Sequence, residues 1–560
     1  MSRIVLRVAL GFMLGAAILP TPIEAAPAPQ LKAGAVAAAD RYGAQAAREI
    51  LQAGGNAVDA AVATAFALAV TYPEAGNLGG GGFMTLYIGG KPYFLDYRET
   101  APAAASATMY LGPDGQPVTD RSLVGNVAAG VPGTVRGMAE AHRRFGRLSW
   151  ARDLAPAIRL ARRGFVVPAG LTAEYQGAKA SFASSNFRRY FGTIATGRTL
   201  RQPELANTLE RIARNGAREF YQGRTADLIV AQMARGAQKG LITHADLAGY
   251  TAKWREPVQG RWHGFDVITA PPPSSGGVGL LQLLVMKEDA APLFKGVALN
   301  SPHYVHLVAE IEKRVFADRA QYFGDPDFVT VPVAGLTDPA YLARRAGEID
   351  PVHPSRLAAV QPGLEKPQTT HFSIVDKWGG AVSNTYTLNG SFGAGVVVEG
   401  AGFLLNDEMD DFSAKPGVPN QFGVVGGDAN AIAPGKRPLS SMSPTILTRH
   451  GKVAMVIGTP GGSRIFTSVF QVLTNVYDFH LPLAGALAVP RFHHQLLPDN
   501  LIYSEPALPL PPALVRALPG LGYRVETQVF SGDMAAIEIE GTKPVVAADP
   551  RARGVALTVP

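Results

Sequence analysis

Thr369 is the residue to which the sequence gives an unusual chemical setting. It begins a stretch in which β-branched and aromatic residues alternate, directly after residues 350–368, whose Pro, Gly and charged residues are typical of an exposed linker. Most threonine hydroxyls inside a chain are weak nucleophiles and serve only to favour strands. Cleavage of the Gln368–Thr369 bond would change this, because a free α-amine has a pKa of about 8 and can accept the hydroxyl proton, directly or through water. One residue would then be both nucleophile and base.

A β-hairpin is predicted to place a second threonine beside the first. Residues 369–376 and 381–388 are strand-like, and a glycine-containing loop joins them. If this loop is centred on Trp378, Thr369 lies opposite Thr387 on the same face of the sheet, with Cβ atoms about 5 Å apart. A register shift of one residue would put the two side chains on opposite faces. We therefore expect Thr387 to hydrogen-bond Thr369.

The part of the chain before the hairpin is predicted to be mainly helical. Residues 37–70 have a helical pattern that Gly54 and Gly55 interrupt, and Asn56 is suited to cap the second half, with Asp59 in its first turn. Further helices are predicted over residues 134–146, 149–163, 204–215, 278–286 and 301–323. No internal repeat of roughly 20–50 residues is visible.

A run of glycines at 79–82 leads into an apolar strand. Such a run invites comparison with a phosphate-binding loop, but no Gly-Lys-Ser/Thr ending follows it. Consecutive glycines also allow two backbone segments to approach closely. We expect close backbone packing here and no nucleotide site.

Composition excludes several classes of function. The 560 residues, 47% hydrophobic and 17% charged, are typical of a soluble globular protein with a large core. The net charge of +7 comes without any Lys/Arg block interleaved with aromatics, so no nucleic-acid partner is expected. The chain has no cysteine, which excludes disulfides and thiolate metal sites. The pair His493-His494 lacks further ligands and, on a strand, would point to opposite faces, so neither a catalytic metal nor a cofactor is expected.

The N-terminus has the pattern of a secretory signal. Arg3 and Arg7 precede an apolar run from Val8 to Leu19, and small residues follow near Ala26. As a helix this run would cover about 18 Å, too little for the roughly 30 Å of a bilayer core. We expect residues 1–26 to be a signal peptide, a periplasmic or secreted location, and no stable membrane insertion.

Beyond these local patterns, an ordered set of motifs resembles one family. The stretch from Gln368 to Ser373 is similar to the processing site of the γ-glutamyltransferase (glutathione hydrolase) family, which belongs to the N-terminal nucleophile hydrolases. The resemblance covers most of the chain after the signal, in residues 54–61, 77–84, 96–99, 271–277, 405–412, 437–444 and 458–464. Each motif alone is weak, but the set in this order is highly specific.

The resemblance implies a fold and a course of maturation. The expected fold is α+β, a four-layer αββα sandwich in which two chains share one core. Thr369 would attack the carbonyl of Gln368, and water would open the resulting ester. The products would be a large chain, 27–368, and a small chain, 369–560, which remain together as a heterodimer.

The resemblance also implies roles for individual residues. Thr369 would attack the γ-carbonyl of a γ-glutamyl donor such as glutathione and pass the acyl group to water, an amino acid or a dipeptide, assisted by Thr387. The backbone amides of Gly461 and Gly462 would form the oxyanion hole. The pocket would hold the substrate α-carboxylate with Arg98, Ser440 and Ser441, and the α-ammonium with Asn389, Glu408 and Asp411.

Simpler interpretations of these charged residues exist. Without the family resemblance, Arg98 would be assigned to a structural ion pair with Asp96 or Glu99, and Asp410-Asp411 to a solvated turn.

Three positions depart from the pattern of enteric bacterial members. Glu408 stands where many have Gln, although animal members have Glu there, and Gly390 follows Asn389 where Thr is common. Phe422 lies in residues 416–427, which resemble a lid over the pocket, at a place often held by Tyr. Phe422 lacks the hydroxyl that Tyr would supply, and we expect this difference to affect the balance between hydrolysis and γ-glutamyl transfer.

Two alternatives remain open at this point. One is a β-lactam side-chain acylase that acts on glutaryl groups, but a glutaryl group lacks the ammonium that Asn389, Glu408 and Asp411 would bind. The other is an uncleaved, inactive exported homologue that serves as a binding protein.

Overall fold

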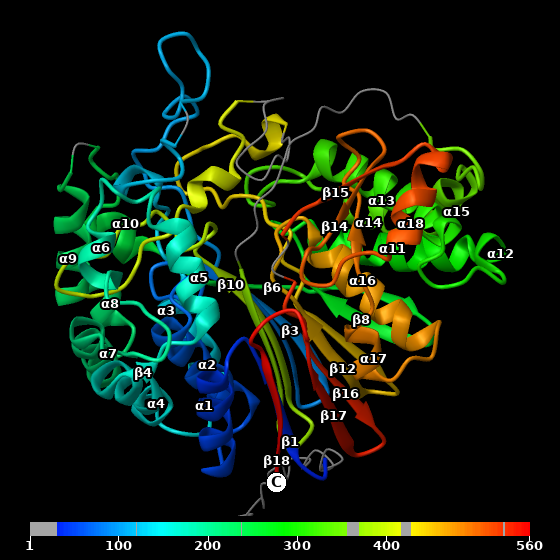
Figure 1. Cartoon of the computed structure of the whole chain (residues 1–560). Coiled ribbons are helices and arrows are strands. Elements are labelled where there is room, and N and C mark those ends of the chain that lie inside the picture. Colours follow the sequence, from blue (N-terminus) through cyan, green and yellow to red (C-terminus); the bar gives the residue numbers. More distant parts are fainter. Residues whose placement is uncertain (1–30, 119, 237, 356–368, 416–426, 530–531) are drawn as a thin grey trace, which may run out of the picture.

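The computed structural model describes residues 31–118, 120–236, 238–355, 369–415, 427–529 and 532–560. The predicted signal peptide, Gln368 and Phe422 lie outside these ranges, so the expectations for them stay predictions. Within the described residues the fold is a mixture of helices and mainly antiparallel sheets, in which β14 (Leu501–Ser504) and β15 (Arg524–Thr527) form a parallel pair (Figure 1). No helix among them is both long enough and apolar enough to span a bilayer.

A seven-stranded antiparallel sheet contains the hairpin that begins after Thr369. In spatial order its strands are β18 (Val555–Val559), β1 (Gly34–Ala38), β9 (Thr370–Val375), β10 (Ala381–Thr387), β2 (Gly81–Ile88), β3 (Lys91–Asp96) and β6 (Lys253–Arg255). β9 and β10 pair in the predicted register, with Ser373 opposite Ser383 and Thr370 opposite Tyr386. One step further along the same register sets Thr369 opposite Thr387.

A second, six-stranded antiparallel sheet faces the first. In spatial order its strands are β17 (Lys543–Ala548), β16 (Ala535–Glu540), β12 (Lys452–Gly458), β11 (Thr445–Arg449), β8 (Phe265–Thr269) and β7 (Val258–Trp262). Hydrogen bonds cross between the sheets: the Ser383 hydroxyl donates to the Ile457 carbonyl and the Ser373 hydroxyl to the Ala535 carbonyl, both at 3.0 Å. The face of the hairpin that carries odd-numbered residues therefore points toward the second sheet.

Helices cover the outer faces of both sheets, as Figure 1 shows. Helix α2 (Ala57–Thr71) lies on the first sheet, and all its residues are buried. The Tyr386 hydroxyl of β10 donates to the Ala65 carbonyl of this helix at 2.9 Å. The helices on this side are α1 (Arg41–Gln52), α2 (Ala57–Thr71), α3 (Thr134–Phe145), α4 (Trp150–Arg163), α5 (Ala169–Ala178), α6 (Phe187–Phe191), α7 (Pro203–Asn215), α8 (Arg218–Gln222), α9 (Arg224–Met233) and α10 (His244–Gly249).

The helices on the side of the second sheet are α11 (Gly276–Asp289), α12 (Ala291–Phe294), α13 (Pro302–Tyr322), α14 (Val333–Leu336), α15 (Pro339–Gly347), α16 (Arg464–Tyr477), α17 (Leu483–Leu487) and α18 (Pro512–Ala517). Of these, α11 contacts β7 and β8, α16 contacts β12, and α17 contacts β17. Two small sheets complete the elements, β4 (Phe165–Val166) with β5 (Thr199–Leu200), and β13 (Phe492–His493) with β14 (Leu501–Ser504) and β15 (Arg524–Thr527).

The predicted helices are confirmed within a few residues, with one correction at the start. Ala37 and Ala38 are not helical but belong to β1, because their backbones pair with β18 and β9 on either side. The helix begins only after Asp40, whose carboxylate accepts from the backbone amides of Tyr42 and Gly43. The predicted cap at Asn56 is confirmed and forms a reciprocal capping box with Asp59.

The glycine run does pack closely, as predicted, and it supports the end of β10. A Cβ atom added to Gly80 would lie 2.0 Å from the Thr387 carbonyl oxygen, and one added to Gly79 would lie 2.1 Å from that of Leu404. The Asn77 amide donates to the same Thr387 carbonyl at 2.8 Å. The loop before β2 therefore fixes the backbone of Thr387 directly.

A buried polar cluster joins three helices of the first layer. Asp59 of α2 accepts from the backbone amides of Arg147 and Leu148, while His142 of α3 and Asp153 of α4 lie beside it. Asp153 is fully buried, and neither of its carboxyl oxygens has a hydrogen-bond partner among the described residues. Burial, and then the neighbouring Asp59 carboxylate, raise the pKa of Asp153 to about 9.

Replacing Asp153 with Asn is expected to remove a pH dependence of stability. In the unfolded chain an Asp ionises at about pH 4. In the fold its pKa is raised, so the wild type loses stability as the pH rises from that value toward the folded pKa. Thermal unfolding midpoints measured between pH 5 and pH 9 should fall less steeply for Asp153→Asn than for the wild type. Glu288→Gln, a change at an exposed position on α11, is the control, and parallel curves for all three proteins would contradict the assignment.

Candidate active site

Thr369 lies immediately before β9 and is almost buried, with 7% of its surface exposed. The register of the hairpin sets it opposite Thr387, which is 3% exposed. The Thr387 hydroxyl oxygen accepts from the backbone amide of Asn389 at 2.8 Å. That bond occupies a lone pair and leaves the hydroxyl proton to be donated elsewhere, as expected if Thr387 supports the Thr369 hydroxyl.

Below the two threonines, the same face of the hairpin carries a column of hydrogen-bonded polar side chains. His371 Nδ1 lies 2.7 Å from the Thr385 hydroxyl, and its Nε2 lies 3.1 Å from the Ser373 hydroxyl. Burial lowers the pKa of His371 to about 3, so its imidazole is neutral. Because Ser373 donates to the Ala535 carbonyl, it accepts from Nε2–H, and Nδ1 accepts from Thr385. The donor and the acceptor of each of these hydrogen bonds are therefore defined.

The two glycines predicted to form the oxyanion hole follow β12. The Ile457 carbonyl accepts from Ser383, and a Cβ atom added to Gly458 would lie 2.2 Å from the His371 ring. Successive residues of β12 therefore lie beside hairpin residues that are progressively closer to Thr369. Gly461 and Gly462, with φ of 136° and 57°, come next, directly before α16. Neither amide has an acceptor among the described residues, and both lie at the positive end of a helix dipole.

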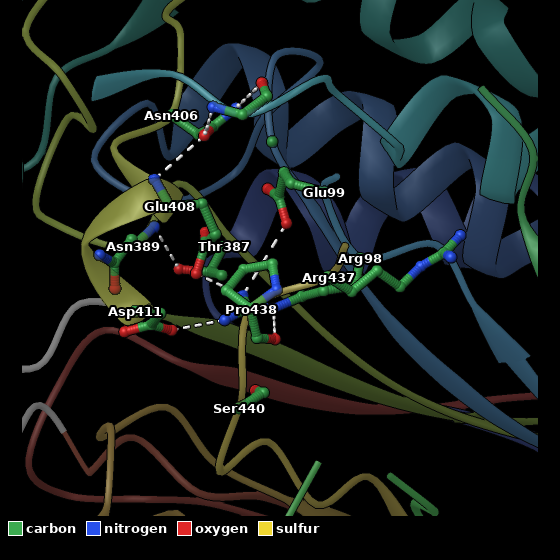
Figure 2. A network of polar contacts seen from close by, with 12 residues as sticks. Arg98, Glu99, Thr387, Asn389, Asn406, Glu408, Asp411, Arg437, Pro438 and Ser440 are labelled. Carbon is green, nitrogen blue, oxygen red and sulfur yellow. Dashed lines mark hydrogen bonds and ion pairs between the residues drawn. The ribbon is translucent and has the colours of Figure 1, made fainter. Parts of the chain in front are cut away.

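Arg98 is the centre of the charged network shown in Figure 2. It follows β3, is 1% exposed, and donates to Glu408 through Nη1 and to Asp411 through Nη2. Nε and Nη2 also donate to the carbonyls of Pro438 and Leu439, at 3.3 and 2.9 Å. Burial would lower the pKa of Arg98, but Glu408 and Asp411 raise it above its ordinary value, so the guanidinium stays charged.

The acids around Arg98 are buried as well. Glu408 and Asp411 lie on a short 3-10 helix, Glu408–Asp411, and burial raises the pKa of each while Arg98 acts in the opposite direction. Glu99 lies 3.8 Å from Arg98, and burial raises its pKa to about 8. The network around Arg98 thus contains carboxyl groups that an ammonium group would stabilise in their charged form.

The simpler interpretation of these charged residues is correct only for the ion pair between Arg98 and Glu99. Arg98 does form an ion pair with Glu99, but Asp96 pairs instead with Arg255 and Arg437, at 2.7 and 3.2 Å. The alternative of a solvated turn at Asp410-Asp411 is wrong, because the two side chains are only 7% and 15% exposed and each accepts a side-chain hydrogen bond.

The remaining residues predicted to bind substrate lie close to the same network. Asn389 has a left-handed backbone, φ 79°, and its amide donates to the Asp407 carbonyl at 3.0 Å. Ser440 and Ser441 directly follow the two carbonyls that Arg98 holds, and they are 4% and 7% exposed. The structure therefore gathers the predicted carboxylate and ammonium residues around Arg98.

Some residues that position the site were not assigned from the sequence. Asn406 accepts from the Gly130 amide and donates to the carbonyls of Gly79 and Gly130, which pins the loop before Glu408. It lies inside a motif that carried the family resemblance, as does Asn77, so the motifs marked them without indicating a role. Arg319, on a helix predicted only as amphipathic, donates to the Ser441 hydroxyl at 3.1 Å.

The described residues include one group of possible metal ligands. Asp59, His142 and Asp153 could bring three ligand atoms together. However, His142 Nε2 lies 3.0 Å from the Leu148 carbonyl, so this nitrogen carries a proton and cannot coordinate a metal. His493 and His494 bond separately, to Thr467 and to the Leu501 carbonyl.

The sequence is similar to a known family and to named relatives over most of its length. The gamma-glutamyltranspeptidase family model matches residues 43–559. The chain is 63% identical to a glutathione hydrolase proenzyme of Pseudomonas aeruginosa, over 94% of this chain and 95% of that one. It is 47% identical to the proenzyme of the same name from Escherichia coli, over 84% and 82% of the two chains.

The fold is also similar to those of solved structures. A cephalosporin acylase from Bacillus halodurans superimposes with a TM-score of 0.79 at 27% identity, over 98% of this chain and 99% of that one. A gamma-glutamyltranspeptidase from Pseudomonas nitroreducens complexed with L-DON matches with a TM-score of 0.57 at 60% identity, over 58% of this chain and 97% of that one. By the match of its sequence to the family model and to these relatives, the chain belongs to the gamma-glutamyltranspeptidase family.

Proposed function

We propose that this chain is a proenzyme that matures into a glutathione hydrolase and γ-glutamyltransferase with Thr369 as its nucleophile. The observation that carries the proposal is the position of Thr369, opposite Thr387 at one end of a paired hairpin, together with the buried Arg98 and its acids. A γ-glutamyl group presents an α-carboxylate, an α-ammonium and a γ-carbonyl. Arg98, the carboxyl groups around it, and Thr369 match these three features in charge and chemistry.

Maturation by self-cleavage is supported by how the two future chains interleave. The Thr369 hydroxyl attacks the Gln368 carbonyl, the peptide C–N bond breaks to free the α-amine of Thr369, and water hydrolyses the ester. In the seven-stranded sheet, β1 lies between β18 and β9, and β2 pairs with β10, so strands from both sides of residue 368 are interleaved. The chains 27–368 and 369–560 would therefore stay together in one core. The finer fold assignment, a four-layer αββα sandwich of the N-terminal nucleophile hydrolase type, belongs to this proposal.

The catalytic cycle uses the same hydroxyl a second time. The Thr369 α-amine accepts the hydroxyl proton as Oγ1 attacks the γ-carbonyl carbon of the donor. The amides of Gly461 and Gly462 stabilise the oxyanion, and the leaving amine takes up the proton as the C–N bond breaks. Water or an amino-acid or dipeptide amine then attacks the γ-glutamyl ester, which regenerates the threonine hydroxyl.

The location of the enzyme is also part of the proposal. Residues 1–26 have the pattern of a cleaved export signal, and we place the mature heterodimer in the periplasm or outside the cell.

A glutaryl acylase is the second candidate, and a specific observation favours it. The chain is 37% identical to an Acylase ACY 1 proenzyme of Pseudomonas sp. over 88% of this chain, and it has the fold of the cephalosporin acylase. A glutaryl group has the same carboxylate as a γ-glutamyl group but no ammonium. Buried Glu408 and Asp411 beside Arg98 favour the ammonium-bearing substrate, because these acids would otherwise lack a cationic ligand.

Thr369→Ala should abolish both maturation and activity, because it removes the hydroxyl that performs both attacks. An SDS gel should show one unbroken chain for this variant and two chains for the wild type. N-terminal sequencing of the smaller wild-type chain should begin at Thr369. Thr370→Ala is the matched control, since the Thr370 hydroxyl is buried without a hydrogen-bond partner on the opposite face, and it should mature normally. A two-chain, active Thr369→Ala protein would refute the nucleophile assignment.

Asp411→Asn should selectively weaken the reaction of substrates that carry the ammonium. Loss of a buried charge partner costs about 2–5 kcal/mol, so kcat/KM for a γ-glutamyl anilide should fall at least tenfold. The rate with the matching glutaryl anilide should change much less. Asp410→Asn is the neighbouring control, because the Asp410 carboxylate accepts from Ser122 instead of Arg98. An equal loss on both anilides would argue against ammonium binding at Asp411.

A further inference from the structure

We propose that Arg319 is a positioning residue for the carboxylate end of the substrate. It holds Ser440 and Ser441 so that their hydroxyl hydrogens remain for the ligand, and it supplies a second buried positive charge there. This inference rests on the proposed function, in that the substrate carries an α-carboxylate at these serines.

Arg319 reaches the pocket from a different element than Arg98. It lies on α13, is 7% exposed, and donates from Nη2 to the Ser441 hydroxyl and from Nε to the Ser275 hydroxyl, each at 3.1 Å. A guanidinium has hydrogen-bond donors only, so both serine oxygens must accept. The direction of these two hydrogen bonds is therefore fixed by chemistry.

The second of these bonds extends to Ser440. The Ser275 hydroxyl accepts from Arg319 and donates to the Ser440 carbonyl at 2.9 Å, and the Ser275 amide donates to the same carbonyl at 2.8 Å. Arg319 thus acts on Ser441 directly and on the backbone of Ser440 through Ser275.

These contacts leave each of the two predicted ligand serines with a hydrogen to donate. Ser441 Oγ accepts from Arg319, and Ser440 Oγ accepts from the Met442 amide at 3.1 Å. Within the part of the chain that the structure describes, neither hydroxyl hydrogen has an acceptor. Adjacent hydroxyls that already accept from the protein are suited to donate to an anionic group such as a carboxylate.

Charge supports the same assignment. Arg319 lies close enough to Asp411 to lower the pKa of that carboxyl group, against the larger effect of burial. Arg98 holds the carbonyls of Pro438 and Leu439, while Arg319 holds Ser441. Two guanidinium groups therefore hold segment 438–441, Arg98 from the side of the first sheet and Arg319 from the side of the second. Both positive charges attract a carboxylate.

The experiment compares two donors that differ only in the carboxylate. γ-Glutamyl p-nitroanilide carries it, whereas 4-aminobutyryl p-nitroanilide retains the ammonium and the scissile amide but lacks the α-carboxylate. Because hydrogen bonds to charged groups are among the strong ones, Arg319→Gln should lower the wild-type preference for the first donor roughly tenfold or more. The loss should lie in kcat/KM for the γ-glutamyl donor and leave the second donor within about threefold.

Controls separate positioning from folding. Formation of two chains on an SDS gel reports that a variant has folded and matured, and Arg345→Gln, a partly buried arginine of α15 bonded to the Arg314 carbonyl, should keep the wild-type preference. Arg319→Lys should recover part of the preference, because it restores the charge but not both hydrogen bonds. If Arg319→Gln fails to mature, Arg319→Lys carries the comparison.

A double-mutant cycle tests whether Arg319 acts through the serine. Ser441→Ala should reduce the preference as well, and the combined variant should lose less than the product of the two single losses. Equal losses on both donors, independent effects of the two substitutions, or failure of both Arg319 variants to mature would overturn the inference. A wild-type protein without activity on the γ-glutamyl donor would instead refute the proposed function.

Discussion

The antiparallel pairing of β9 with β10 is the constraint on which the site depends. Because side chains alternate along a strand, this register decides that Thr369, His371 and Ser373 share the face that meets the second sheet. A shift of one residue would turn Thr369 toward α2 and place apolar side chains between the sheets. Loop 77–80 secures the far end of the pair by packing against the Thr387 carbonyl. Burial on both sides leaves the hairpin little freedom to slip.

The charged network around Arg98 pairs its own opposite charges before any ligand binds. Arg98 contacts two of the acids that are proposed to bind an ammonium, so opposite charges of the protein neutralise one another in a buried space. A zwitterionic ligand brings one charge of each sign and can take over these interactions without leaving a buried charge unpaired. A ligand that has only a carboxylate would compete with the acids for Arg98 and would bring no cation to pair with them. Selectivity of this kind follows from desolvation more than from shape.

Local patterns in the sequence predicted much of this molecule. The alternation around Trp378 fixed the hairpin register, and Asn56 with Asp59 marked the start of α2, because these features depend on residues close together in the chain. At Ala37 and Ala38 the sequence favours a helix because alanine is a strong helix former, and only pairing with β9 and β18 overrides that preference. The bonds from Arg98 to Glu408 and Asp411 span more than 300 residues, and the bond from Arg319 to Ser441 spans 122, so no local pattern could indicate them.

The interleaved strands of the seven-stranded sheet have a consequence for the life of the mature protein. The precursor assembles this sheet as a single chain, in which β1 and β9 are tethered to each other. After the proposed cut, a fully unfolded molecule would have to reassemble from two separate polypeptides, at a rate that depends on their concentration. Each piece alone would expose unpaired strand edges prone to aggregation. The mature enzyme would then persist because it unfolds slowly, and a molecule that did unfold would rarely recover its activity.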